Sequence, residues 1–361
     1  RTVGYSGRCR DLTQEQKSRY EREGRKPVIR LHVPDQTVVF HDLVQGELSV
    51  ESSQIADFVI QREDGTSPYN LAVVVDDSLM KISHVIRGND HVPNTPKQVL
   101  LNNAFGYDIP AFAHTPMIAG QDGARLSKRH GHTSVEEFRQ EGYLPECLIN
   151  FLSLLSWSSE TGDEILSGTR LIEEFSFDRI SRSPARFDRV KLNWMNGVYI
   201  RNLTAEERLT NAKPFLERAG MIEKERARLS KIVESVKDKV ETFAEYPKYV
   251  ELFFTEMVSI TGENEIEIVQ DEDSRKIFRL LIDELKKIEQ LTVENFSNAM
   301  KNIQIQTGLK GKKLWMPVRI ALTGQVHGPE LPVVLEIYGR DKCITLLDKA
   351  CAEGHGFRNS L

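Results

Sequence analysis

The sequence is poor in cysteine. Its 361 residues contain four cysteines, Cys9, Cys147, Cys343 and Cys351, and no two of them form a Cys-x-x-C pair. Disulfide frameworks and structural zinc sites need cysteines at characteristic spacings, so neither is predicted here. Reduced thiols in a reducing compartment are expected instead.

Long hydrophobic runs are also missing. No apolar stretch approaches the roughly 20 residues that cross a bilayer, and the N-terminus lacks the charged-then-apolar pattern of a secretory signal. These absences predict a soluble, cytoplasmic protein with no membrane partner. An initiating methionine is missing too. The chain opens at Arg1 in a polar, basic stretch, which we interpret as the continuation of a longer polypeptide.

Excess charge is small, because the formal net charge is −5, but the charges are unevenly distributed. Residues 1–30 hold nine Lys or Arg against four Asp or Glu, and residues 179–191 hold five against one. Residues 305–320 hold four basic residues and no acid. Separate basic patches suit an extended polyanion that touches the protein at several places. A solvated charged surface is the alternative for any single patch.

Length favours two or three domains, and the first half has the pattern of an α/β fold. The first sixty residues indicate mixed β structure. The apolar, β-branched runs "FVI" and "LAVVV" predict buried strands. Residues 94–106 have helical spacing with a glycine at the end, and the short segment 111–120 leads into a glycine-edged loop. This order is typical of the back half of a doubly wound nucleotide-binding domain.

The second half reads as all-helical. Ser134 with Glu137 and Thr204 with Glu207 form two capping-box patterns at helix starts. The segment 144–157 is apolar nearly all round and predicts a buried helix. A further helix is predicted with Ile277, Leu280, Leu281, Leu285 and Ile288 on one face, whereas the acidic stretch "GENEIEIVQDED" (262–273) is interpreted as a linker. The predicted fold class is therefore α/β followed by all-α.

The loop after the α/β half places three cations in five residues, Arg125-Leu126-Ser127-Lys128-Arg129. These cations repel one another, so their grouping gains stability only when a polyanion binds among them. A mobile lysine and a serine in a glycine-edged loop can surround triphosphate oxygens. Basic loops are common, but this one lies between an α/β half and a helical half, where a lid over a nucleotide is expected.

At this point the sequence resembles a known family. "LSKR" is similar to the Lys-Met-Ser-Lys-Ser loop of class I aminoacyl-tRNA synthetases. The blocks "YSGRCRDL", "DFVIQREDGTSPYNLAVVVDDSLMKISHVIRGNDHVPNTPKQ", "RLSKRHGHTSVEEF", "KLNWMNGVYIRNLT" and "KGKKLWMPVRIALTG" resemble bacterial-type glutamyl-tRNA synthetase. The resemblance implies the second half of a Rossmann-type catalytic domain with a connecting mixed α/β insertion. Helical stem-contact and anticodon-binding bundles should follow.

The resemblance also suggests domain limits. Residues 1–56 would be the remainder of the acceptor-binding insertion, and 57–133 the second half of the catalytic domain with its loop. Residues 134–203 would contact the tRNA stem, and 204–262 and 263–361 would be two helical anticodon-binding subdomains. The His-Ile-Gly-His motif of the class is absent from the sequence, because none of the nine histidines has that context. By resemblance the motif should precede Arg1.

The implied activity is ATP-dependent activation of L-glutamate to glutamyl-adenylate, followed by transfer to the 3′ end of tRNA(Glu). ATP with Mg²⁺, L-glutamate and the tRNA are the implied partners, and no zinc is predicted. A monomer is expected. Two alternatives stay open: a non-discriminating enzyme that also charges tRNA(Gln), and a tRNA-binding module without catalysis. The sequence does not distinguish them.

Residue roles follow from the same resemblance. Lys128 and Ser127 would be catalytic, within an ATP-binding loop that spans Arg125, Leu126, Ser127, Lys128 and Arg129. Arg125 stands where the family has its first lysine. Arg87, Tyr69 and His91 would bind the amino acid, with Arg87 pairing its side-chain carboxylate. Without the resemblance, Arg87 would be interpreted as a structural ion pair and Tyr69 as a core aromatic.

Candidates for contact with tRNA complete the set. Asp76 and Asp77 would either meet the tRNA end or cap a helix, and the sequence favours neither. In the helical part, lysines are the candidates for contact with the anticodon: Lys237, Lys239, Lys310, Lys312 and Lys313.

Overall fold

The computed structural model describes residues 5–126, 134–256 and 258–352. It divides into two compact units: residues 1–133 with 149–188, and residues 134–148 with 189–361. The chain passes between the units three times, and one of these points lies within helix α5 (Pro145–Ser153). No helix in the described ranges is long and apolar enough to span a membrane.

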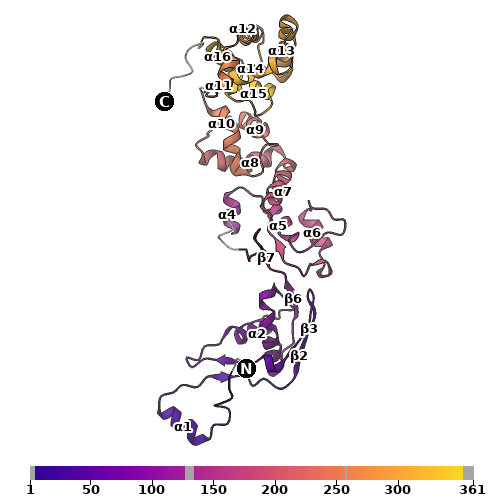
Figure 1. Cartoon of the computed structure of the whole chain (residues 1–361), viewed down its shortest axis with the longest axis vertical. Coiled ribbons are helices and arrows are strands. Elements are labelled where there is room, and N and C mark those ends of the chain that lie inside the picture. The colour runs from indigo at the N-terminus through magenta and orange to yellow at the C-terminus, as the bar shows by residue number, and fades with distance from the viewer. Residues whose placement is uncertain (1–4, 127–133, 257, 353–361) are drawn as a thin grey trace. The chain divides into compact units, whose positions relative to one another are not determined.

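The first unit combines short strands with helices (Figure 1). Its elements, in chain order, are α1 (Gln14–Arg22), β1 (Ile29–Arg30), β2 (Thr37–Asp42), β3 (Gly46–Glu51), η1 (Ser52–Gln54), β4 (Val59–Gln61), α2 (Tyr69–Leu79), β5 (His84–Gly88), η2 (Asn89–Asn94), α3 (Thr95–Phe105), β6 (Ala111–Thr115), β7 (Ile118–Ala119), α6 (Gly168–Glu174), η4 (Phe177–Arg179) and β8 (Ala185–Arg186).

The main sheet has four strands in the order β3-β2-β6-β5. Strands β2 and β3 form an antiparallel hairpin, whereas β2 and β5 both run parallel to β6. Side chains of β2 alternate between exposed and buried, as a strand with one covered face requires. The core behind it contains Val38, Phe40, Val99, Leu100 and Phe112, so α3 packs on this face.

One predicted strand is wrong. The run "LAVVV" lies in helix α2, which begins after the N-cap residue Pro68. Of this run, Val74 is buried, and α2 packs against α3. β-Branched side chains lower helix propensity only slightly, so packing of one helical face overrides their preference for strands. Of the other run, "FVI", Val59 and Ile60 lie in β4, which within the described residues pairs with β1 in a separate two-stranded sheet.

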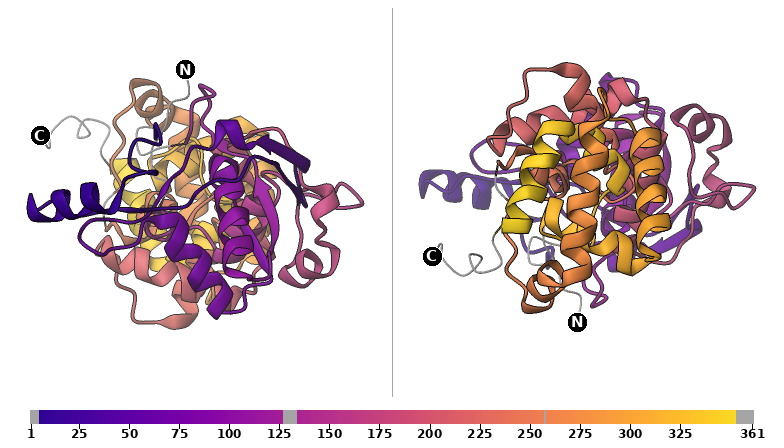
Figure 2. Two further views of the ribbon diagram at one scale, coloured as in Figure 1. Left: turned by 90° about the horizontal axis from the view of Figure 1, so that it is seen from below. Right: turned by 90° about the horizontal axis from the view of Figure 1, so that it is seen from above.

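The second unit is helical, and the predicted capping boxes at its helix starts are confirmed. Ser134 and Glu137 cap α4 (Val135–Gln140), and Thr204 and Glu207 cap α8 (Ala205–Arg218). The remaining elements are α7 (Arg189–Asn202), α9 (Arg226–Glu234), η5 (Phe243–Glu245), α10 (Tyr246–Phe254), α11 (Glu263–Gln270), α12 (Glu272–Lys286), α13 (Val293–Thr307), α14 (Lys312–Thr323), α15 (Leu331–Tyr338) and α16 (Arg340–Ala352). Figure 2 shows the last of these helices, in orange and yellow, side by side.

Two expectations about the helical part are wrong. The acidic stretch 262–273 forms helix α11 and the first turn of α12, with Val269 buried against neighbouring helices. Acidic residues in a first turn stabilise a helix through its dipole, so the charge that suggested a linker favours the helix. The helix predicted within 144–157 is confirmed as α5, but Ile149 and Leu152 are exposed, so it is not buried all round.

The apolar face predicted for 277–288 is confirmed in part. Ile277, Leu281 and Leu285 are buried in α12, with Phe278 and Ile282 beside them. Ile288 lies beyond the last helical residue, Lys286, because the helix ends two residues earlier than the pattern.

Candidate active site

Three neighbouring strands of the main sheet end at one edge and place polar side chains there. Asp42 is the last residue of β2, Arg87 lies near the end of β5, and His114 lies near the end of β6. The parallel register pairs Arg87 with His114 and Asp42 with Phe112. The carboxyl edge of parallel strands is where α/β sheets bind ligands. The sheet topology therefore marks this edge as the candidate site.

Three neutral acceptors from β6 and α3 hold Arg87, and the Tyr69 side chain of α2 hydrogen-bonds it as well. Its Nε donates to His114 Nε2 at 3.1 Å, and its Nη2 donates to Thr95 Oγ1 at 2.9 Å and to Gln98 Oε1 at 2.8 Å. Both Thr95 and Gln98 come from the first turn of α3, directly behind the site. A structural ion pair needs a carboxylate, and none of these partners supplies one. The guanidinium keeps its charge without an anion in hydrogen-bond contact.

The ionisation of the site follows from burial and hydrogen bonding. Burial lowers the pKa of Arg87, although Tyr69 and Asp77 act in the opposite direction. Burial also lowers the pKa of His114, despite the nearby carboxylate of Asp42. For Asp42 itself, burial raises the pKa, but hydrogen bonds from Gln45 and His114 outweigh it and leave the pKa below its usual value. At neutral pH the site thus contains an ionised Asp42, a neutral His114 and a cationic Arg87.

Two further predicted substrate residues lie around Arg87. The rings of Tyr69 and His91 are 5.9 Å apart, and Tyr69 is 49% exposed, so it is not a core aromatic. His91 lies in η2, where its Nδ1 is 3.3 Å from Asn94 Nδ2. The structure therefore brings Tyr69, Arg87 and His91 to one place, as the resemblance implied.

Asp76 and Asp77 lie in the last turn of α2, close to its C-terminal end at Leu79. Carboxylates stabilise the N-terminal end of a helix rather than the C-terminal end, so the helix-capping alternative is wrong. Burial raises the pKa of Asp77, and the charge of Arg87 opposes that change. Asp76 is exposed. Contact with tRNA stays a prediction for both.

The loop predicted to bind ATP is described only at its base. Leu126 N donates to Ile118 O at 2.9 Å, and Arg125 extends its Nη1 to within 3.5 Å of Asp90 Oδ2. Asp90 belongs to η2, the same short helix as His91, so the base of the loop borders the substrate residues. Ser127, Lys128 and Arg129 lie outside the described residues, and their roles stay predictions.

The predicted anticodon lysines differ in how they are engaged. Lys237 Nζ lies 2.5 Å from Oε1 of Glu234, the last residue of α9. Lys239, Lys310, Lys312 and Lys313 are exposed. The last two open helix α14, where cations are unfavourable for the helix dipole. Their position gives the helix no stability, which is compatible with a role in binding an anion.

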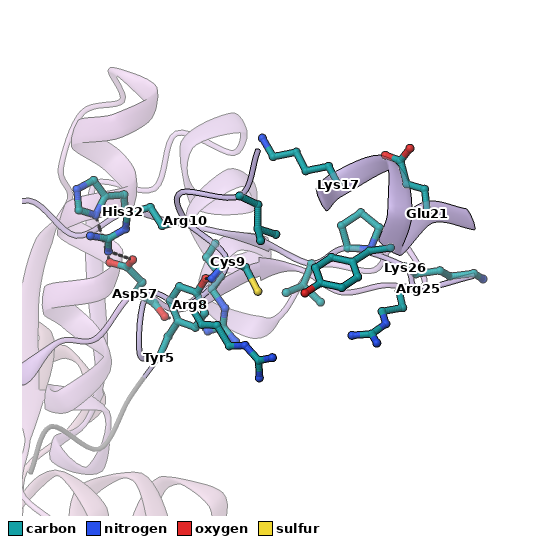
Figure 3. Close-up of a pocket in the computed structure, with 15 residues that line it drawn as sticks. Tyr5, Arg8, Cys9, Arg10, Lys17, Glu21, Arg25, Lys26, His32 and Asp57 are labelled. Atoms are coloured by element: carbon teal, nitrogen blue, oxygen red, sulfur yellow. Dashed lines mark hydrogen bonds and ion pairs between the residues drawn. The ribbon is translucent and has the colours of Figure 1, made fainter. Parts of the chain in front are cut away.

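A basic cavity of about 710 Å³ lies in the first sixty residues (Figure 3). Arg30 stacks over the ring of Tyr5 at 4.5 Å, and Arg25 over that of Tyr20 at 4.6 Å. On one side of the cavity, the Asp57 carboxylate accepts hydrogen bonds from the Arg10 side chain and from the backbone N–H of Val33. The basic residues among those that line it are Arg8, Arg10, Lys17, Arg25, Lys26 and Arg30. Cations interleaved with aromatic rings suit phosphates and unstacked bases.

Sequence reasoning missed four residues of the site: Asp42, Thr95, Gln98 and His114. All four are buried, whereas polar residues are usually exposed. The available signal was a polar residue ending each of two apolar runs, "VVFHD" and "AFAH". That signal does not tell which strands are neighbours, so it could not place these residues beside Arg87.

Comparison with known proteins agrees with this architecture. Residues 2–194 match the family "tRNA synthetases class I (E and Q), catalytic domain", and residues 207–351 match "Anticodon binding domain". The fold and the site thus define a class I tRNA synthetase with an anticodon-binding part.

Among curated relatives, the chain is 45% identical over 341 residues to the glutamate–tRNA ligase of Carboxydothermus hydrogenoformans, covering 93% of this chain and 71% of that protein. It is 43% identical to glutamate–tRNA ligase 1 of Caldicellulosiruptor saccharolyticus, covering 95% and 72%. A crystal structure of a glutamate tRNA ligase from Elizabethkingia meningosepticum, in complex with its amino acid, superposes with a TM-score of 0.89 at 28% identity. That superposition covers 98% of this chain and 74% of the other. The chain belongs to the glutamate–tRNA ligase family.

Proposed function

We propose that the chain takes part in ATP-dependent activation of L-glutamate and in its transfer to the 3′ end of tRNA(Glu). The observation that carries the assignment of the amino-acid site is the charge of Arg87. A half-buried guanidinium whose protein acceptors are all neutral is stabilised by an incoming carboxylate. An amide in the same place would leave that charge unpaired, which supports selection of glutamate over glutamine.

The chemistry needs no covalent link to the protein. The α-carboxylate of glutamate attacks the α-phosphorus of ATP, and pyrophosphate leaves. The ribose hydroxyl of the tRNA then attacks the glutamyl carbonyl, and AMP leaves as the ester forms. The contribution of the protein is to position the reactants and to stabilise negative charge. Arg87 and Tyr69 would orient glutamate, and Lys128 with Ser127 would stabilise the phosphates as pyrophosphate leaves. Mg²⁺ would arrive with ATP as part of the substrate.

Substitution of Lys128 tests this proposal in the complete protein. We expect Lys128→Ala to lower the rate of glutamate-dependent ATP–pyrophosphate exchange, measured with tRNA present, by about a hundredfold or more, because loss of one preorganised charge typically costs that much. Affinity for tRNA should change little. Equal losses of exchange and of tRNA affinity would contradict the role of the loop. Full exchange activity in the variant would contradict the role of Lys128, and tRNA binding without exchange in the wild type would favour the non-catalytic alternative.

tRNA specificity needs a separate measurement. Charging of tRNA(Glu) and tRNA(Gln) with labelled glutamate, compared as kcat/KM, distinguishes a discriminating from a non-discriminating enzyme. We propose the discriminating form, acting as a monomer in the cytoplasm. The wide spacing of the four cysteines supports a reducing compartment.

A further inference from the structure

Two consecutive buried hydrogen bonds connect Asp42 of β2, through His114 of β6, to Arg87 of β5. His114 Nδ1 lies 2.6 Å from Asp42 Oδ2, and Arg87 Nε lies 3.1 Å from His114 Nε2. The side chains of Asp42 and His114 are both fully buried. A histidine with this degree of burial has no access to solvent. The roles of its two ring nitrogens are therefore set by protein partners: Asp42 at Nδ1, and Arg87 with Thr95 Oγ1, 3.2 Å away, at Nε2.

The direction of these bonds follows from the number of donors that face Asp42. Its Oδ1 accepts from the backbone N–H groups of Val44 at 3.0 Å, Gln45 at 2.8 Å and His114 at 3.1 Å. A carboxylate among so many donors is an acceptor only, so His114 Nδ1 must carry the proton and donate it. The neutral ring then presents the lone pair of Nε2 to Arg87. Asp42 thus sets the tautomer that Arg87 needs.

The same geometry determines which part of Arg87 is left for a ligand. The N–H of Nε and both N–H groups of Nη2 are used by His114, Thr95 and Gln98. Among the hydrogen bonds described for the sheet and for α3, none uses Nη1, and the Tyr69 side chain of α2 is a further hydrogen-bond partner of the guanidinium. Ordering a side chain costs conformational entropy. For Arg87 the hydrogen bonds within the protein already impose this order, so ligand binding loses less entropy. The guanidinium is therefore held in one plane with Nη1 outward.

We propose that Asp42 and His114 are positioning residues for glutamate binding. They act through Arg87 by fixing the plane of its guanidinium group. Thr95 and Gln98 of α3 restrain the same group by accepting hydrogen bonds from Nη2. This inference rests on the proposed function of Arg87 as the partner of the glutamate side-chain carboxylate. A guanidinium that is free to turn would adapt to other polar groups, so the buried pair serves both affinity and the distinction between glutamate and glutamine.

The test compares isosteric variants in the complete protein. Asp42→Asn keeps the size of the side chain but donates to His114 Nδ1, which moves the ring proton to Nε2 and turns it toward Arg87 Nε–H. His114→Asn retains a donor toward Asp42 and removes the acceptor of Arg87. His114→Gln places an amide oxygen nearer to Arg87 and should rescue part of the loss. His41→Gln, an exposed neighbour on β2, is the matched control.

We expect the KM for glutamate in tRNA charging to rise about tenfold to a hundredfold in Asp42→Asn and His114→Asn, the range for a lost hydrogen bond to a charged group. His114→Gln should lie between these variants and the wild type, and His41→Gln should match the wild type. The KM for ATP and the affinity for tRNA should change less than threefold. Unchanged glutamate KM in both isosteric variants, or equal rises in all three constants, would overturn the inference.

Arg87→Gln separates this inference from the proposed function. If Arg87→Gln leaves the KM for glutamate unchanged, the role of Arg87 is wrong, and the inference falls with it. If Arg87→Gln raises the KM and the isosteric variants do not, only the inference is wrong. In the double variant Arg87→Gln/Asp42→Asn, the two effects should not add, because both act through one group.

A pH profile of the wild type covers the case in which a variant fails to fold. Protonation of His114 would remove the acceptor of Arg87, so the KM for glutamate should rise as the pH falls below about 6.5, the ordinary pKa of histidine. The charged or titratable groups that face His114 are Asp42 from β2, Arg87 from β5 and His91 from η2. Because His91 is the other histidine that faces His114, the rise should persist in His91→Gln. A flat profile in the wild type, or a rise that disappears in His91→Gln, would contradict the inference.

Discussion

At the scale of single residues, the buried pair of Asp42 and His114 links stability to pH. Burial lowers the pKa of His114 below the value of 6.5 that it has when unfolded. Between those two values the unfolded chain binds one more proton than the folded chain. For Asp42, burial alone raises the pKa, but its hydrogen bonds leave it below 3.8. The contribution of ionised Asp42 to the free energy of unfolding is therefore also lost in acid. This loss occurs at lower pH than the loss caused by His114.

We predict that the free energy of unfolding of the first unit decreases as the pH falls from 7 to 5. One proton accounts for a slope of at most about 1.4 kcal/mol per pH unit, and His114 should supply part of it. Urea unfolding at several pH values, followed by tryptophan fluorescence, measures this slope. It should be smaller in His114→Gln than in the wild type and unchanged in His41→Gln. Equal slopes in all three proteins would contradict the assignment of a buried neutral histidine.

Arg87 also shows what the sequence could and could not establish at this scale. The resemblance placed Arg87, Tyr69 and His91 in one site, and the structure brings them together. Its supporting residues could not be predicted, because His114 reaches Arg87 only through the pairing of β5 with β6. Asp42 reaches His114 only because β2 lies on the other side of β6. These are long-range pairings that no local pattern encodes.

At the scale of elements, glycines with positive φ end helices and let segments pack closely. Gly142 follows α4 with φ of +83°, and its carbonyl oxygen accepts from Phe243 N at 3.1 Å. A Cβ at this position would lie 2.7 Å from both Cβ and N of Phe243. Gly220 follows α8 with φ of +76° and has no atom within 4 Å of such a Cβ. The two glycines share a backbone conformation and differ in their surroundings.

We therefore predict that Gly142→Ala destabilises the second unit much more than Gly220→Ala. The left-handed backbone should cost each variant about 1–2 kcal/mol. The clash with the backbone of η5 should add about 1–3 kcal/mol to Gly142→Ala only. Chemical denaturation of the two variants side by side measures the difference. Equal losses would mean that α4 and η5 separate at little cost.

The predictions of elements succeeded where the signal was local. Capping boxes and helix-ending glycines act within one turn, so they located the starts of α4 and α8 and the end of α3 at Gly106. Two segments failed for opposite reasons. The β-branched run in α2 becomes helical because one of its faces packs against α3. The acidic stretch of α11 becomes helical because its charges lie at the favourable end of the helix.

At the scale of the whole molecule, a chain of net charge −5 separates its cations into patches. One patch lines the cavity near the N-terminus, and another is formed by Lys310, Lys312 and Lys313 before and at the start of α14. Each cation that neutralises a phosphate releases a counterion from the nucleic acid, so binding weakens with added salt in proportion to the number of contacts. The salt dependence of tRNA binding thus measures how many patches touch the polyanion.

We predict that replacing Lys310, Lys312 and Lys313 by glutamine reduces the slope of log Kd against log salt by about 2–3, from roughly 0.7–0.9 for each phosphate contact. Kd for tRNA(Glu) would be measured by fluorescence anisotropy from 50 to 200 mM KCl, a range that keeps the contacts measurable. The triple replacement of Lys213, Lys276 and Lys286, which are exposed elsewhere in the helical unit, controls for net charge. If both triple variants lower the slope equally, the effect comes from total charge rather than from a binding surface. A lower slope in the first variant alone, with an unchanged KM for glutamate, would assign the patch to the tRNA and separate its role from that of Arg87.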